Sequence, residues 1–587
     1  MSRIILIIIL SLVDTQAAAP MNTRPRIYQL LPRLFGNLNE TRKPNGTLAE
    51  NGVGKFADID DKTLASLRDE LSITHLWLTG VLAQATSAHY PDIGKPADDP
   101  VLLKGLAGSP YAIKDYGDVC PDYAIDPANR IAEFRALITR AHNAGLKILI
   151  DFVPNHVARS HTSTVVAFGQ KDDPTHFFAP TNNFFWLQHD SHGGGPPLRL
   201  PPGTFDPEKH TARVTGNNAA TWTPSRNDWY ETVKLNYGFD FTTGHRSYHP
   251  TPDTWHKMDT VLAHWQTLGV DGFRCDMAHM VPPEFWQWAV PRARARQPSA
   301  YFVAEAYNND PMKVDSSHGK QNVMTELLQA GFDAVYDDPT YKALKRIYEG
   351  PAWANDLDSL FHDQHLFHHS LRYAENHDEV RIASPQHWGN HGPALGLPIS
   401  AILWSLGRGP ALIYSGQELG EPATGAEGFG SDDGRTTIFD YWSLPTLIHW
   451  RKNTLTPEQQ THRKNYGKLL HIIGQPAFRD GTFQPLNPHN INNDQYGRLP
   501  GEPASGHWLY TFLRATPEQR YLITVNLHPT QTLRDIRIHL PAPIHATPTD
   551  RYGTATATID PTGKQIQIPQ IPPLTPALFE LLNAPTK

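Results

Sequence analysis

Short apolar segments alternate with amphipathic segments along most of the chain. In the stretch 130–144, for example, apolar residues recur at helical spacing. Near-continuous apolar strands that are separated by such helices are typical of parallel strands covered on both faces. The pattern predicts eight strands, at residues 27–31, 74–79, 147–152, 270–274, 301–305, 334–337, 371–375 and 411–415.

Eight successive βα units predict a (β/α)₈ barrel of the TIM type, with its chemistry at the carboxyl ends of the strands. A doubly wound open sheet is disfavoured because no glycine-rich dinucleotide fingerprint follows the first strand. The barrel is expected to occupy 20–156 and 256–479. A long segment rich in Gly, Pro, Asn and Trp predicts a subdomain inserted after the third strand, at 157–255. Alternating short strands then predict a C-terminal antiparallel β-sandwich over 480–587.

The first 19 residues have the three-part organisation of a secretory signal peptide. Arg3 precedes an apolar run at 4–13, and three alanines follow at 17–19. The run is shorter than the roughly 20 residues of a membrane-spanning helix, and no later stretch supplies one. We therefore expect an exported protein, periplasmic or extracellular, with no membrane span after cleavage. An uncleaved anchor is the alternative.

The composition excludes several classes of function. The 587 residues carry 52 basic and 59 acidic side chains without a basic block, so nucleic acid is not expected as a partner. Cys120 and Cys275 are too few for a disulfide framework or a four-thiolate zinc site. The 14 Trp, 21 Tyr and 24 Phe include enough flat faces to hold a sugar, although most of them belong to the core. No organic cofactor is expected.

Acidic residues follow four of the predicted strands. They lie in DFVPNHV (151–157), GFRCDMAHM (272–280), VAEAY (303–307) and ENHDEV (375–380). A single such acid is equally consistent with a structural ion pair, because a buried carboxylate needs a partner. Four acids at the same end of one barrel favour a catalytic site over separate structural ion pairs. A nucleophilic carboxylate beside a proton-donating carboxylic acid is what cleavage of a glycosidic bond requires.

In this order, the four segments resemble the conserved regions of the α-amylase family of glycoside hydrolases, of the bacterial secreted or periplasmic type. The segments YQLLPRLFGN, SPYAIKDY, NDWYETVKLNYG and ALIYSGQELG also fit, so the resemblance covers the chain from about residue 25 onward. It implies a retaining hydrolase that cuts α-1,4-glucosidic bonds of starch, glycogen or maltooligosaccharides through a covalent glycosyl-enzyme. A related transglycosylase or a neopullulanase/cyclodextrin-type hydrolase is the alternative, followed by a non-catalytic glucan-binding homologue.

The resemblance assigns catalytic roles to three acids. Asp276 matches the nucleophile and Glu305 the acid/base, which must be protonated before the first step. Asp378 matches the third carboxylate, expected to grip sugar hydroxyls and stabilise the oxocarbenium-like transition state. Arg274 precedes Asp276 by two residues on the same strand face, and its charge is expected to keep Asp276 ionised.

The resemblance also implies residues around the acids. Asp151 and Arg381 match positions that organise the hydrogen bonds of the site. Where many relatives have a Lys-His pair after the nucleophile, this chain has His279 and Met280, which leaves its preference on the leaving-group side open. The sugar-binding positions match Tyr111, which would be an aromatic platform, and His156, Arg274, His279 and His377.

Metal binding is left open by the sequence. Asn155 matches the family's calcium-ligand asparagine, and Met280 stands where relatives contribute a backbone carbonyl. Calcium takes about six to eight oxygen ligands, and the sequence does not fix the others. The histidine-rich stretch 361–370 is better interpreted as a solvated helix face than as a metal site. Candidate calcium partners in the insertion are Asp190, Asp206 and Asp228.

Overall fold

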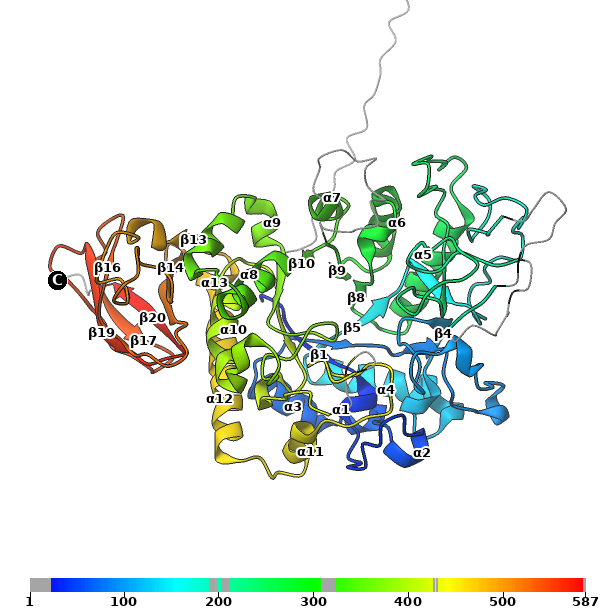
Figure 1. Ribbon diagram of the computed structural model, residues 1–587, viewed down its shortest axis with the longest axis horizontal. Helices are drawn as coiled ribbons and strands as arrows, with labels where there is room; N and C mark the ends of the chain where they lie inside the picture. The colour runs from blue at the N-terminus through cyan, green and yellow to red at the C-terminus, as the bar shows by residue number, and fades with distance from the viewer. Residues whose placement is uncertain are drawn as a thin grey trace, which may run out of the picture.

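Figure 1 presents the computed structural model of the protein, which describes residues 23–188, 196, 198–201, 208, 211–307, 323–425, 428 and 431–583. The predicted signal peptide lies outside the described residues, as do Asp190 and Asp206. Within the described part of the chain, no helix combines the length and apolar character needed to cross a membrane.

Eight parallel strands close into a barrel in the order β1-β12-β11-β10-β9-β8-β5-β2, which confirms the predicted (β/α)₈ architecture. Each strand overlaps one predicted segment. The register between two of them sets Asp151 opposite Arg274, before any side-chain contact is considered. The strands are β1 (Arg26–Leu30), β2 (His75–Leu78), β5 (Lys147–Phe152), β8 (Gly272–Cys275), β9 (Tyr301–Ala304), β10 (Ala334–Tyr336), β11 (Ser370–Tyr373) and β12 (Ala411–Tyr414).

Helices cover the outside of the barrel (Figure 1). In α4 the buried residues Phe134, Leu137, Ile138 and Ala141 follow the spacing of one helix face, as the sequence predicts for 130–144. The helices are α1 (Pro32–Phe35), α2 (Leu48–Asn51), α3 (Asp61–Asp69), α4 (Arg130–Asn143), α5 (Asp253–Thr267), α6 (Pro283–Arg296), α7 (Val323–Gln329), α8 (Asp338–Glu349), α9 (Gln364–His368), α10 (Gly396–Ser405), α11 (Pro445–Arg451), α12 (Pro457–Ile473) and α13 (Pro476–Arg479).

Two excursions of the chain build the wall around the barrel mouth. After β2, strands β3 (Leu82–Gln84) and β4 (Ile113–Val119) form a two-stranded sheet. Between β5 and β8, strands β6 (His156–Ala158) and β7 (Thr232–Lys234) pair antiparallel. A small core joins the second excursion to Leu102 of the first, and its other buried members are Phe185, Leu187, Leu198, Leu200, Ala212 and Val214.

The C-terminal region folds into two antiparallel sheets, which confirms the predicted β-sandwich. One sheet has the order β13-β14-β15-β20-β17 and the other β16-β19-β18. Helix α10 is buried along its whole length because it packs against the barrel and also against β15 and β20. The strands are β13 (Thr482–Pro485), β14 (Leu509–Ala515), β15 (Arg520–Asn526), β16 (Leu533–His539), β17 (Ala546–Asp550), β18 (Thr558–Ile559), β19 (Gln565–Ile571) and β20 (Thr575–Asn583).

The two cysteines do not form a disulfide. Cys120 and Cys275 are both buried with free thiols. Burial raises the pKa of each thiol well above its ordinary value, so both are expected to be unreactive.

Candidate active site

The candidate active site lies at the carboxyl ends of the barrel strands. Asp276 follows the last residue of β8, and Glu305 follows the last residue of β9. The backbone ladder extends to both residues, because Asp276 N–H donates to the Phe152 carbonyl at 2.8 Å and Glu305 N–H to the Cys275 carbonyl at 3.0 Å. The sheet therefore fixes the two acids more firmly than a free loop would.

Arg274 joins three of the predicted acids beneath the site. Its Nη1 lies 2.7 Å from Asp276 Oδ1 and 3.3 Å from Asp151 Oδ1. Its Nη2 lies 2.9 Å from Glu305 Oε2. The arginine side chain is only 1% exposed, and its Nε donates to the Tyr336 hydroxyl at 3.1 Å. Arg274 thus holds the carboxyl groups from below, as a positioning residue.

Opposing influences act on the pKa of Asp276. Burial and the neighbouring Glu305 carboxylate raise the pKa of Asp276 well above its ordinary value, although Arg274 opposes this. Taking a carboxylate out of water is strongly unfavourable, and Arg274 divides its charge among three acids. The charge of Arg274 thus favours the ionised form of Asp276, while burial and Glu305 act against it. Burial also raises the pKa of Asp151, to about 6.

Asp378, in the loop after β11, is the most open of the three catalytic candidates. Its side chain is 33% exposed, against 7% for Asp276 and 5% for Glu305. Burial of its carboxyl within the site and the nearby Glu305 raise the pKa of Asp378 to about 7. A carboxyl group at the rim of the acid cluster is well placed to meet sugar hydroxyls.

His377 connects Asp378 to Tyr111. Its Nδ1 accepts from the Gln29 side-chain amide at 2.8 Å, so the ring proton is on Nε2. That nitrogen lies 3.1 Å from Asp378 Oδ2 and contacts the Tyr111 hydroxyl. The rings of Tyr111 and His377 stack with their centroids 5.3 Å apart. Burial lowers the pKa of His377 well below its ordinary value, so the ring is neutral.

His156 stands on β6, in the second excursion. Burial and the nearby charges of Lys234 and Lys104 lower the pKa of His156 to about 3. Its ring lies 5.3 Å from that of Trp229. A neutral imidazole can still donate one hydrogen bond to a sugar hydroxyl without adding positive charge to the site.

Arg381 shapes the loop that carries His377 and Asp378. Its Nη1 lies 2.9 Å from Glu375 Oε2, and both side chains are fully buried. The other Glu375 oxygen accepts from the Ile382 N–H at 2.9 Å, which closes the loop. Arg381 thus contacts Glu375 rather than the catalytic candidates.

A cavity of about 310 Å³ opens above the acids. Five sequence-predicted residues line it: Tyr111, His156, Asp276, Glu305 and Asp378. The other predicted residues, which are Asp151, Arg274, His279, His377 and Arg381, lie behind this lining. His279 is nearly buried, with Nδ1 3.5 Å from the Glu305 carbonyl oxygen and its ring 5.8 Å from that of Tyr307. Its sugar-binding role remains a prediction.

Sequence analysis missed two groups that contact Glu305. The Tyr307 hydroxyl donates to Glu305 Oε1 at 3.1 Å, and the Met277 N–H donates to Glu305 Oε2 at 2.8 Å. Tyr307 belongs to the same VAEAY segment and stands two residues after Glu305, a spacing that puts side chains on one face of an extended chain. Met277 has a φ of 42°, in the left-handed region that a non-glycine residue rarely adopts. A methionine in the sequence gives no indication of this backbone conformation.

Sequence analysis also missed an ion pair in the cavity wall. Lys104 Nζ lies 3.2 Å from Glu231 Oε1, and both residues line the cavity together with Trp229 and Phe439. Lys104 comes from the excursion after β2, and Glu231 immediately precedes β7. No motif marks such a pair, since its two members belong to different loops.

Asn155 and Met280, which the sequence offers to calcium and the structure describes, face an ammonium group instead of an open site for a divalent cation. Asn155 Oδ1 accepts from the Lys234 ammonium group, and the Met280 carbonyl accepts from the same group at 3.0 Å. Within the described residues, no cluster of three or more His, Cys, Asp or Glu is arranged to hold a metal ion, and this includes the histidine-rich stretch 361–370. Asp228 instead caps a turn, accepting from the Ser225 N–H at 2.7 Å.

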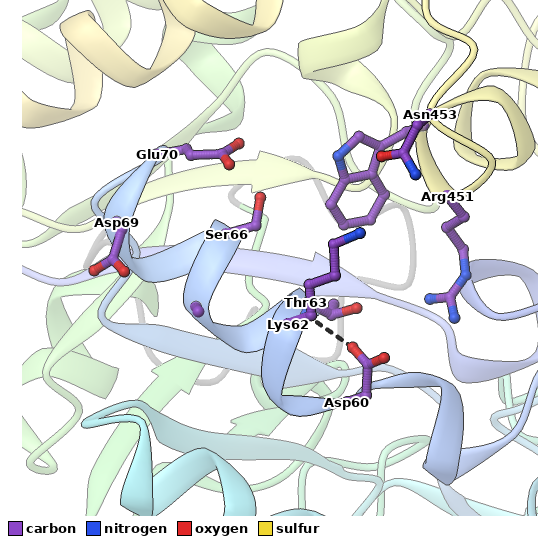
Figure 2. Close-up of a pocket in the computed structure, with 10 residues that line it drawn as sticks. Asp60, Lys62, Thr63, Ser66, Asp69, Glu70, Arg451 and Asn453 are labelled. Atoms are coloured by element: carbon purple, nitrogen blue, oxygen red, sulfur yellow. Dashed lines mark hydrogen bonds between the residues drawn. The ribbon is translucent and has the colours of Figure 1, made fainter.

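A second cavity, of about 420 Å³, lies in the outer helical layer between α3 and α11 (Figure 2). Polar side chains surround it, including Lys62, Glu70 and Asn453. Asp60 Oδ1 accepts from the Thr63 N–H at 2.8 Å and so caps the start of α3. None of the sequence-predicted site residues lines this cavity. We therefore assign the candidate active site to the cavity at the barrel mouth.

Comparison with known proteins identifies the family of the chain. The sequence profile described as "Alpha amylase, catalytic domain" matches residues 29–468. The chain belongs to the alpha-amylase family. Among curated relatives of this alpha-amylase family protein, "Alpha-amylase MalA" of Haloarcula japonica is 26% identical over 361 residues, which is 60% of this chain and 40% of that protein. The chain spans 30 to 40% of the length of the first curated relatives that it matches.

Solved structures of the family share the fold over almost the whole chain. An alpha-amylase from Lactobacillus plantarum has a TM-score of 0.59 and 20% identity, over 95% of this chain and 99% of that one. A debranching enzyme from Nostoc punctiforme has a TM-score of 0.60 and 18% identity, over 95% and 98% of the two chains. At these identities the structural similarity establishes the fold of this alpha-amylase family protein. The function has to be inferred from the residues of its own site.

Proposed function

We propose that this protein hydrolyses α-1,4-glucosidic bonds of starch, glycogen or maltooligosaccharides with retention of anomeric configuration. One observation carries the proposal. The Arg274 guanidinium lies between Asp276 and Glu305, at 2.7 Å and 2.9 Å, below a cavity that Asp378 also lines. Two carboxyl groups that share one guanidinium are close neighbours, as a nucleophile and an acid on one glycosidic bond must be.

The reaction would proceed in two steps. First, the protonated Glu305 gives its proton to the glycosidic oxygen while an Asp276 carboxylate oxygen bonds to C1. The bond from C1 to the leaving sugar breaks, and a covalent β-glycosyl-enzyme results. Second, the Glu305 carboxylate takes a proton from water, whose oxygen bonds to C1 as the bond to Asp276 breaks. Hydrogen bonds from Tyr307 and Met277 hold Glu305 in place for both transfers.

The charge distribution of the site suits a cationic transition state. Asp151, Asp276 and Glu305 surround a single guanidinium, and Asp378 adds a fourth carboxyl group. An excess of carboxyl groups in a water-poor site stabilises the positive charge that develops on the sugar ring. Because the buried histidines stay neutral, they do not oppose this effect.

The cavity favours short substrate segments. A volume of about 310 Å³ is at the small end of the range for ligand pockets. The Lys104–Glu231 ion pair forms part of its wall, so it borders the space that a bound glucan would occupy. We therefore propose maltooligosaccharides and glucan chain ends as the preferred substrates.

The test compares wild type with Glu305→Gln by reducing-sugar release and product chromatography on soluble starch, pullulan and cyclodextrin. The matched control is Glu458→Gln, a fully exposed glutamate on α12. Maltooligosaccharides that disappear only in Glu305→Gln would support the proposal, and NMR should find the first-formed product in the α configuration.

Other outcomes would favour the alternatives. Longer or cyclic products indicate a transglycosylase, and cleavage of pullulan or cyclodextrin indicates a neopullulanase/cyclodextrin-type hydrolase. Binding of glucan by a folded wild type that turns over no glucan indicates a non-catalytic homologue.

We also propose that residues 1–19 direct export to the periplasm or out of the cell. The three-part pattern of charged, apolar and small residues supports this. N-terminal sequencing of protein recovered from periplasmic and culture fractions should find chains that lack this segment. Full-length chains found only in the cytoplasm would contradict the proposal.

A further inference from the structure

We propose that the ammonium group of Lys234 is a built-in cation that replaces calcium between Asn155 and Met280, and that Lys234 positions His156 for sugar binding. The positioning part rests on the proposed function, whereas the replacement of calcium does not. Lys234 is the last residue of β7, and the register of the β6–β7 pair sets it opposite His156.

Lys234 is buried, and its ammonium group lies between two oxygen atoms of the site loops. Its side chain is only 5% exposed, and a buried ammonium group needs oxygen acceptors to offset its lost hydration. Asn155 Oδ1 and the Met280 carbonyl are two such acceptors. Asn155 follows β5, and Met280 ends the short 3₁₀ helix η6 (Ala278–Met280) after β8. One ammonium group of the insertion thus hydrogen-bonds to the loops that follow two strands of the barrel, β5 and β8.

The chemistry of the acceptors favours an ammonium group over calcium. Both acceptors are neutral, one a side-chain amide and the other a backbone carbonyl. Calcium prefers six to eight oxygens at about 2.3–2.6 Å and gains most from carboxylates. A calcium ion in contact with these two oxygens would lie within a few ångströms of the Lys234 charge and would be repelled by it. An ammonium group needs only a few acceptors for its three donors.

The same contacts orient His156. Because Asn155 Oδ1 accepts from Lys234, its Nδ2 points the other way, to the Gly216 carbonyl at 2.9 Å and to His156 Nδ1 at 3.0 Å. An amide that donates to Nδ1 leaves the imidazole proton on Nε2. His156 lines the cavity, and in this tautomer its one N–H is on Nε2, where the backbone of Tyr111 is a neighbour that a sugar hydroxyl would share or replace. Lys234 therefore acts on the substrate through Asn155 and His156.

The first experiment measures calcium directly. Purified wild type and Asn155→Ala are compared by elemental analysis and calcium titration, and their melting temperatures are recorded with and without EDTA. We expect the same calcium content in both proteins and the same shift with EDTA. Calcium bound by wild type and lost in Asn155→Ala would overturn the proposal. These readouts need no glucan hydrolysis, so they separate this inference from the proposed function.

The second experiment tests positioning with Lys234→Met, which keeps the length of the side chain and removes its charge. The control is Lys342→Met, a half-exposed lysine on α8. We expect KM for maltooligosaccharides to rise at least about tenfold in Lys234→Met and kcat to fall less, since the acceptors of Lys234 are Asn155 and Met280. A lower melting temperature with unchanged KM would reduce Lys234 to a structural role and overturn the positioning claim.

Discussion

Tyr510 of β14 donates its hydroxyl to Asp358 of the barrel, at 2.7 Å. Asp358 lies in the 3₁₀ helix η7 (Ala354–Leu360), so this bond crosses the contact between the C-terminal sandwich and the barrel. Burial raises the pKa of Asp358 to about 6, and the hydrogen bond from Tyr510 only partly opposes this. The carboxyl group is therefore a pH-dependent element of the domain contact.

Asp358→Asn should stabilise the protein above pH 6. A carboxyl group whose pKa is higher in the folded than in the unfolded state loses stability as the pH rises through that window, here from about 4 to 6. Removing the charge should recover up to about 3 kcal/mol at pH 8 and almost nothing at pH 4, from roughly 1.4 kcal/mol per pKa unit. Urea unfolding at both pH values would measure this. A variant less stable than wild type at pH 8 would refute it.

Arg274→Lys should lower kcat/KM by about 10³-fold or more, because one compact ammonium group cannot span the carboxyl groups that a planar guanidinium holds. Steady-state kinetics and a melting curve would separate lost catalysis from lost folding. Arg292→Lys, at a half-exposed arginine paired with Asp259, is the control. An Arg274→Lys enzyme within tenfold of wild type would show that the shared guanidinium is not needed.

Met277→Gly and Met277→Pro should behave oppositely. Glycine keeps the N–H that Glu305 accepts and adopts a positive φ without strain, so we expect activity within a few-fold of wild type. Proline lacks the N–H and fixes φ near −65°, so we expect a loss of about 100-fold or more. Kinetics on a maltooligosaccharide would compare the two. Equal activities would mean that this amide does not orient the acid.

A double variant, Lys104→Met with Glu231→Gln, should widen the substrate range. Both members are changed together because the buried Glu231 carboxyl would lose its partner if Lys104 alone were changed. We expect the ratio of kcat/KM for long to short maltooligosaccharides to rise several-fold, as the ion pair no longer closes that wall. The ratio is measured on a chain-length series. No change in it would indicate that the pair does not limit access.

The barrel and its acids can be predicted well from the sequence because a short, contiguous segment indicates each strand and the acid that follows it. A buried parallel strand is a continuous apolar segment, and an acid such as Glu305 stands directly at its end. A contact between two loops, in contrast, is not indicated by any single segment of the sequence. Lys234 and Asn155 are 79 positions apart, and neither residue alone indicates that an ammonium group faces the amide oxygen. The left-handed backbone at Met277 is likewise set by tertiary contacts rather than by its residue type.

The pairing of β1 with β12 determines when this fold can form during synthesis. Arg26 pairs with Ala411, so the first strand lacks one neighbour until most of the chain has left the ribosome. Helix α10 then still needs β15 and β20 to cover its outer face. The nascent chain consequently carries an open sheet edge until β12 has emerged, and an uncovered apolar helix until the sandwich has emerged. Truncating the sandwich would leave the barrel closed but the outer face of α10 uncovered.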